Sequence, residues 1–71
     1  MDMIGNIHEC AGRVLSELAR SEKINILSIA GHLGERSTIV YQSIGWLACE
    51  GRVRYLQEGN QVYISLPENG K

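Results

Sequence analysis

Apolar residues change their spacing at Gly51, within the stretch "TIVYQSIGWLACEGRVRYL" of residues 38–56. Before Gly51, Val40, Ile44 and Leu47 follow one another at intervals of four and three residues, which is the spacing of one helix face. After Gly51, apolar residues alternate with arginines, which is the two-residue period of a strand. The stretch therefore predicts a helix that ends at Gly51 and leads into a strand.

The N-terminal part of the chain predicts a longer helix. From about residue 3 to residue 20, apolar residues recur at three- and four-residue spacing, so one helix face is expected to point toward a core. The members of this face are Ile4, Ile7, Ala11, Val14, Leu15 and Leu18. Alternating residues at 23–26 then predict a short strand that pairs beside a hairpin.

A second, shorter helix is predicted over "IAGHL", residues 29–33. Ser28 is expected to cap it, and Gly34 to end it in the left-handed conformation. A tight connection leads to the helix that ends at Gly51, which we expect to be capped by Ser37 or the residue beside it. The shared core of the three helices is predicted to contain Leu15, Leu18, Val40, Ile44 and Leu47.

The C-terminal part of the chain predicts a β-hairpin. Residues 52–55 and 61–66 both alternate between polar and apolar side chains. Gly59-Asn60 suits a two-residue loop between them, because Gly adopts positive φ without a Cβ penalty. Pro67 and the closing "ENGK" are expected to form a frayed tail.

The resulting order is helix, strand, helix, helix, strand, strand, in a single α+β domain over residues 1–71. With "LSIAGHLGERSTIVYQSIGWLACEGRV" as a helix-turn-helix and Leu47, Gly51 and Val53 at the helix exit, it resembles the winged-helix superfamily. More narrowly, "IGNIHECAGRVLSEL", "VYQSIGWLACEGRV" and the hairpin resemble a family of small, uncharacterised prokaryotic winged-helix proteins. The resemblance covers nearly the whole chain. It specifies the fold but not the function, since winged helices bind DNA, RNA or proteins.

The charge balance limits the kind of nucleic-acid binding to expect. Seven Lys and Arg residues against eight Asp and Glu residues give a formal net charge of −1 and a pI near 6.1. Nucleic-acid binders usually carry a basic surface, so this balance argues against strong, nonspecific DNA affinity. Residues 37–51 hold no Lys or Arg, whereas Arg52 and Arg54 make the hairpin locally basic.

The resemblance to DNA-binding winged helices implies that the third helix enters the major groove and that the wing touches the backbone. Opposite its core stripe, this helix carries Thr38, Gln42, Gly45 and Cys49. Gln pairs bidentately with adenine, and Thr contacts a thymine methyl or a phosphate. The candidate DNA-binding residues are Arg36, Ser37, Thr38, Tyr41, Gln42, Arg52 and Arg54. The alternative is that these are ordinary solvent-facing residues.

Two pairs of apolar residues are candidates for a dimer or partner interface. Ile39 and Trp46, seven residues apart, share a flank of the third helix. Trp46 is expected either to pack against the first helix or the hairpin, or to face a partner. If residue 55 lies opposite residue 64, Leu56 and Tyr63 pair on the outer sheet face. A domain this small gains stability by burying such surface, so we expect a homodimer.

Other classes of function find no support in the residue pattern. His8, Cys10 and His32 have no metal-ligand spacing, and no catalytic triad, glycine-rich phosphate loop or paired-carboxylate site is evident. We therefore expect no metal, cofactor, small-molecule ligand or enzyme activity. Cys10 and Cys49 fit reduced thiols, and neither a membrane span nor a signal peptide is recognisable, so we expect a cytoplasmic protein.

The leading hypothesis from the sequence is a transcriptional regulator that binds duplex DNA as a homodimer on two half-sites. The alternative is a protein-interaction or assembly module that uses the third helix or the wing face and binds no nucleic acid. An RNA-binding winged helix is a third and weaker option, since no residue specifically indicates RNA binding.

Overall fold

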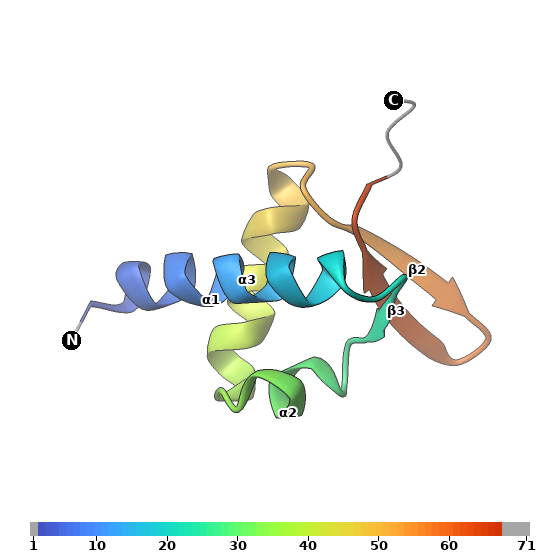
Figure 1. Cartoon of the computed structure of the whole chain (residues 1–71), viewed down its shortest axis with the longest axis horizontal. Coiled ribbons are helices and arrows are strands. Elements are labelled where there is room, and N and C mark those ends of the chain that lie inside the picture. Colours follow the sequence, from blue (N-terminus) through green and yellow to red (C-terminus); the bar gives the residue numbers. More distant parts are fainter. Residues whose placement is uncertain (1, 68–71) are drawn as a thin grey trace.

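The computed structural model describes residues 2–67 and contains three helices and a small antiparallel sheet (Figure 1). In chain order the elements are α1 (Met3–Ala19), β1 (Ile24–Asn25), α2 (Ile29–Leu33), α3 (Ser37–Cys49), β2 (Arg54–Glu58) and β3 (Gln61–Ser65). The predicted order of elements is confirmed. Pro67 follows the last strand, and the rest of the predicted tail lies outside the described residues.

Helix α1 begins with a side-chain cap and extends beyond the core. A carboxylate oxygen of Asp2 accepts a hydrogen bond from the backbone N–H of Gly5 at 3.1 Å, which satisfies one free donor of the first turn. The first buried residue of the helix is Cys10. Ile4, predicted on the inward face, is instead 69% exposed, because the N-terminal turns of α1 project past the crossing with α3 (Figure 1).

Helix α3 ends at Gly51, as the sequence predicted, and the structure shows that it does so in a Schellman motif. Gly51 has a φ of 72°, and its N–H donates to the carbonyl of Ala48 at 3.0 Å. The N–H of Arg52 donates to the carbonyl of Leu47 at 2.9 Å. These bonds satisfy two of the last carbonyls of the helix and turn the chain toward the sheet. Gly34, with a φ of 66°, ends α2 in the same way.

The predicted serine caps are only partly right. Ser28 holds the N-cap position of α2, but its side chain forms no cap hydrogen bond. At α3 the N-cap is Arg36, the residue beside Ser37, and again no side chain caps the helix. Arg36 has the extended backbone typical of an N-cap, at a ψ of 139°, whereas Ser28 is already helical at a ψ of −21°.

The sheet has the strand order β1-β3-β2, with both pairs antiparallel. Tyr55 lies opposite Ile64, the register proposed from the sequence, and Ile64 also lies opposite Ile24 of β1. Gly59, at a φ of 63°, forms the two-residue loop with Asn60. Strand β2 begins at Arg54, so the predicted strand position of Arg52 is wrong, because Arg52 still belongs to the turn that closes α3.

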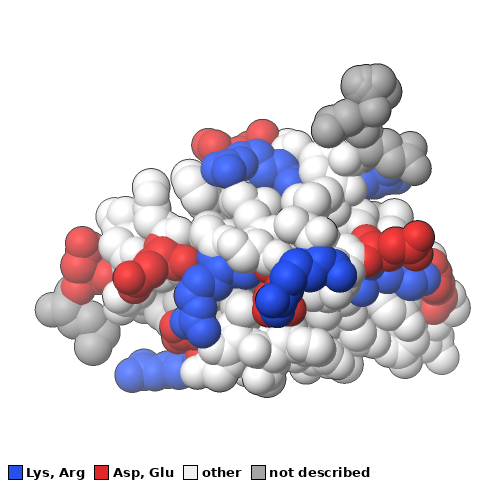
Figure 2. Space-filling view, in the orientation of Figure 1, with Lys and Arg blue, Asp and Glu red and all other residues white. Residues whose placement is uncertain are grey.

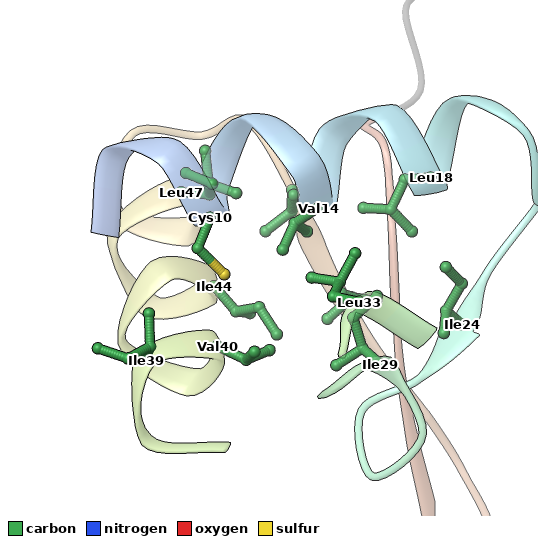
Figure 3. Packing of buried hydrophobic residues seen from close by; sticks show 13 residues of the cluster. Cys10, Val14, Leu18, Ile24, Ile29, Leu33, Ile39, Val40, Ile44 and Leu47 are labelled. Carbon is green, nitrogen blue, oxygen red and sulfur yellow. The ribbon is translucent and has the colours of Figure 1, made fainter. Parts of the chain in front are cut away.

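The core lies where α1 crosses α3, and it continues to α2 and the sheet (Figure 3). Helices α1 and α3 form the most extensive helix–helix contact of the domain. Of the predicted core residues, Leu18, Val40, Ile44 and Leu47 are buried, and Leu15 is partly buried against them. The remaining buried apolar residues are Cys10, Ala11, Val14, Ile24, Ile29, Leu33, Ile39, Val53 and Ile64.

Replacing Leu47 with Ala is expected to lower the free energy of unfolding by about 2 to 5 kcal/mol, since it leaves a cavity at a fully buried position. Leu27→Ala is the matched control. Leu27 is 75% exposed, so its truncation should change stability by no more than about 0.5 kcal/mol. Urea unfolding followed by circular dichroism measures both. Equal midpoints for the parent and Leu47→Ala would contradict the assigned core.

Candidate functional site

The outward face of α3 divides into a polar N-terminal half and a largely apolar C-terminal half. Ser37, Thr38, Tyr41 and Gln42, all predicted as DNA contacts, are exposed in the first half. The second half carries half-buried Gly45 and Trp46, and exposed Cys49. The helical spacing thus assigned the outward face correctly, and the structure adds that its two halves differ in chemistry.

Two of the three candidate arginines have side chains without a partner among residues 2–67. The side chains of Arg36, just before α3, and Arg52, just after it, form no hydrogen bond or ion pair there. Arg54 of β2 is exposed but already engaged in an interaction. Arg36 and Arg52 are therefore positioned at opposite ends of α3, and no other described side chain engages their guanidinium groups.

Most other cations of the described chain are paired with carboxylates. The contacts are Arg13 with Glu35 at 2.6 Å, Arg20 with Glu17 at 2.8 Å and Lys23 with Glu58 at 2.5 Å. Arg13 also donates to the carbonyl of Leu33. Basic and acidic side chains are interspersed on the face shown in Figure 2, which has no continuous basic surface.

An apolar groove lies beside the C-terminal half of α3, between this helix and the projecting turns of α1. We call it the α1–α3 groove, and its lining residues are Ile4, Ile7, His8, Gln42, Gly45, Trp46 and Cys49. Its volume is about 500 Å³, and no Lys, Arg, Asp or Glu lines it. Apart from its chain neighbours and the backbone of its own helix, a Cβ placed on Gly45 would meet nothing within 4 Å, so the surface at this residue is open.

Trp46 packs against α1, which was one of the two outcomes considered from the sequence. Its ring lies 4.8 Å from that of His8, centroid to centroid, with the planes inclined at 30°. Trp46 stays half-buried and lines the groove. Ile39, predicted to share an exposed flank with it, is only 8% exposed and belongs to the core, so it offers little surface to a partner.

Ser43 joins the two walls of the groove, and the sequence reasoning missed it. It is fully buried, and its hydroxyl lies 2.8 Å from the carbonyl oxygen of Ile39 and 3.1 Å from that of Ile7 in α1. The Ser43 hydroxyl thus donates to backbone carbonyls of both helices. The available signal was its position, three residues after Val40 and four before Leu47, on the inward stripe of α3.

The outer face of the wing is partly covered. Leu56 and Tyr63 are cross-strand partners, as the register predicted, and both are half-buried. The Nζ of Lys23 lies 4.5 Å from the Tyr63 ring centroid and donates to a carboxylate oxygen of Glu58. That hydrogen bond is the main reason why the pKa of Lys23 is raised above 10.5.

Within residues 2–67, no group of three or more His, Cys, Asp or Glu side chains is arranged to hold a metal ion. None of the helices in this part of the chain combines the length and apolarity that a membrane crossing needs. Cys10 and Cys49 are both free thiols, the first buried and the second exposed.

Helices α2 and α3 form a helix-turn-helix. Helix α1 precedes it in the chain and a β-hairpin wing follows it, and this arrangement defines a winged helix-turn-helix domain. The chain belongs to the family of winged helix-turn-helix domains designated DUF2582, whose family model matches residues 1–66. The α+β winged-helix prediction and the resemblance to an uncharacterised family are thereby confirmed. No curated protein matches the chain.

Removing the Glu58 carboxylate is expected to lower the pKa of Lys23. In Glu58→Gln, this pKa should fall toward 10.5, because the bond to Glu58 is the largest cause of the increase. Glu22→Gln is the control and should lower it less, since the contribution of Glu22 is the smallest. A titration of the Lys23 side chain by NMR measures both, and equal shifts would contradict the assigned contact.

The same contact predicts a pH dependence of stability. A pKa raised by folding means that the contribution of Lys23 is present below pH 10.5 and is lost as the pH rises through the raised pKa. The parent should therefore be more stable than Glu58→Gln at pH 8, and this difference should shrink at alkaline pH. A constant difference in unfolding midpoint at all pH values would contradict this assignment.

Proposed function

We propose that this domain is a cytoplasmic transcriptional regulator that binds duplex DNA, with the N-terminal half of α3 in the major groove. The observation that carries the proposal is an exposed, polar first half of α3 that follows Arg36, whose side chain has no partner among residues 2–67. Recognition helices of this class contact base edges mainly through their N-terminal residues. The two free thiols suit a reducing compartment such as the cytoplasm.

Phosphate contacts would come from both ends of α3 and from the wing. A helix of 13 residues is about 20 Å long, so Arg36 and Arg52 reach backbone positions on opposite sides of the inserted helix. Arg54 of β2 adds a contact from the wing. Three such contacts predict a slope of about −3 for log affinity against log salt, at about −0.9 per contact.

Base contacts would come from Gln42 and Thr38. Gln42 is central on the outward face, and an amide side chain pairs bidentately with adenine. Thr38 suits a thymine methyl group, and Ser37 and Tyr41 suit phosphate oxygens. With so few cations, sequence-specific contacts have to supply much of the affinity.

A specific observation also favours a second candidate function, protein docking without nucleic-acid binding. The α1–α3 groove borders the face that would enter DNA, and none of its lining residues is Lys, Arg, Asp or Glu. Apolar grooves beside helices are a recurring site for partner helices. The two candidates differ in whether Gln42 contacts a base or a protein.

Selection from a random duplex pool, followed by fluorescence anisotropy at two salt concentrations, tests the proposal. Enrichment of a sequence and a slope near −3 are expected. Salt-sensitive binding without enrichment would reject the regulatory role. Absence of binding even at low salt would reject DNA binding and favour protein docking.

Changing Gln42 to Ala is expected to relax the base preference at one position of the selected site by about 1 to 3 kcal/mol. Binding to sequences that already differ at that base should change little. Cys49→Ala, also on the outward face but near the C-terminal end of α3, is the matched control and should keep the preference. An unchanged preference in Gln42→Ala would contradict its role in base recognition.

Changing Arg36 or Arg52 to Ala is expected to weaken binding to all sequences alike and to reduce the salt slope by about 1. Arg20→Ala, which removes an exposed arginine at the C-cap of α1 that is paired with Glu17, is the control and should leave both quantities unchanged. Salt titrations of the three variants decide the point. Parent-like binding by both α3-end variants would refute the phosphate contacts.

A further inference from the structure

Two surfaces that carry candidate interface residues border the proposed DNA contacts, and they differ in charge. On the wing, the hollow beside Leu56 is lined by four charged residues, namely Glu22, Lys23, Arg54 and Glu58. The α1–α3 groove is lined by no Lys, Arg, Asp or Glu. Two copies of the groove would therefore meet without desolvating a Lys, Arg, Asp or Glu of their linings, whereas two copies of the wing hollow would have to desolvate four charged residues each.

The projecting turns of α1 supply the group that such a contact needs. Met3 is 46% and Ile4 is 69% exposed, and burial begins only at Cys10. These turns are helical although they contribute little to the core of their own domain. Met3, Ile4 and Ile7 have the spacing of one helix face, so the turns form an amphipathic arm whose apolar side is largely unpartnered.

The groove holds both halves of a self-complementary contact. It offers a protruding aliphatic side chain, Ile4, and an open surface at Gly45, with the Trp46 ring at its side. A two-fold interface needs both halves on one surface, because each copy contributes the same patch. We propose that the α1–α3 groove binds the same groove of a second copy, with Ile4 of each copy placed over Gly45 and against Trp46 of the other.

The size of a stable interface determines what this contact covers. A standard interface buries about 800 Å² of solvent-accessible surface on each partner, which is roughly one sixth of the 4586 Å² of accessible surface of this chain. An area that large extends from the α1 arm over the C-terminal half of the outward face of α3. Gln42 lines the groove and is therefore covered.

The overlap at Gln42 makes self-association and DNA binding compete, a consequence that rests on the proposed function. Two half-sites in successive major grooves require recognition helices about 34 Å apart. A contact through the groove holds the two α3 helices far closer than that. The homodimer is then the resting form and a single copy binds DNA, in place of the dimer on two half-sites expected from the sequence.

Sedimentation equilibrium of the full chain tests the contact. The parent should show a concentration-dependent mass between monomer and dimer. Ile4→Ser should raise the dissociation constant at least tenfold, and it should fold normally because Ile4 is outside the core. Leu27→Ser, an exposed aliphatic residue that does not line the groove, is the matched control and should associate as the parent does.

Trp46 fluorescence gives an independent measurement, because it is the only tryptophan. Dilution of the parent through the dissociation range should shift its emission to the red, and Ile4→Ser should already show the shifted spectrum at high concentration. A parent that remains monomeric at several hundred micromolar would overturn the proposal and leave the groove to a different protein. Parent-like association of Ile4→Ser would overturn it as well.

A DNA titration separates this inference from the proposed function. Ile4→Ser should bind the selected duplex at least as tightly as the parent, and added duplex should convert parent dimer to monomer. Weakened association of Ile4→Ser without DNA binding by any variant would support the groove contact and reject the proposed function. Duplex bound to an intact dimer would overturn the competition at Gln42.

Discussion

The crossing of α1 over α3 is the contact on which the rest of the domain depends. Small side chains, Cys10 and Ala11 of α1 and Ser43 of α3, are all buried there and let the two helices approach closely. The Ser43 hydroxyl then satisfies its hydrogen-bonding need on backbone carbonyls of both helices. This crossing fixes the core above α2 and also sets the walls of the α1–α3 groove, so stability and surface chemistry share one origin.

The architecture could be predicted because its signals are local. Helical and strand periods differ, and the glycines at positions 34, 51 and 59 adopt the positive φ that ends a helix or forms a tight hairpin loop. The serine caps were less predictable, because the backbone conformation just before each helix decides which residue takes the extended N-cap position. Ser28 is already helical, and Arg36 takes the extended N-cap position before Ser37.

The outward residues of α3 could be identified by spacing alone, but the groove could not. Its walls come from residues about 40 positions apart, and their approach depends on the angle at which α1 crosses α3. Ile4 continues the apolar spacing of α1 and thus looks like a core residue, although it is 69% exposed. Ile39 fails in the opposite sense: it lies outside the three-residue stripe of α3, yet it is only 8% exposed and belongs to the core.

The strand order has a consequence for how the domain loses structure. Strand β3 is the last element of the described residues but the middle strand of their sheet, so β1 and β2 each pair with β3 and not with each other. Ile64 of β3 is fully buried and lies opposite residues of both neighbours. Loss of β3 from the sheet therefore unpairs all three strands together. The exposed loop at Gly59-Asn60 is the place in the sheet where extra residues would be tolerated most easily.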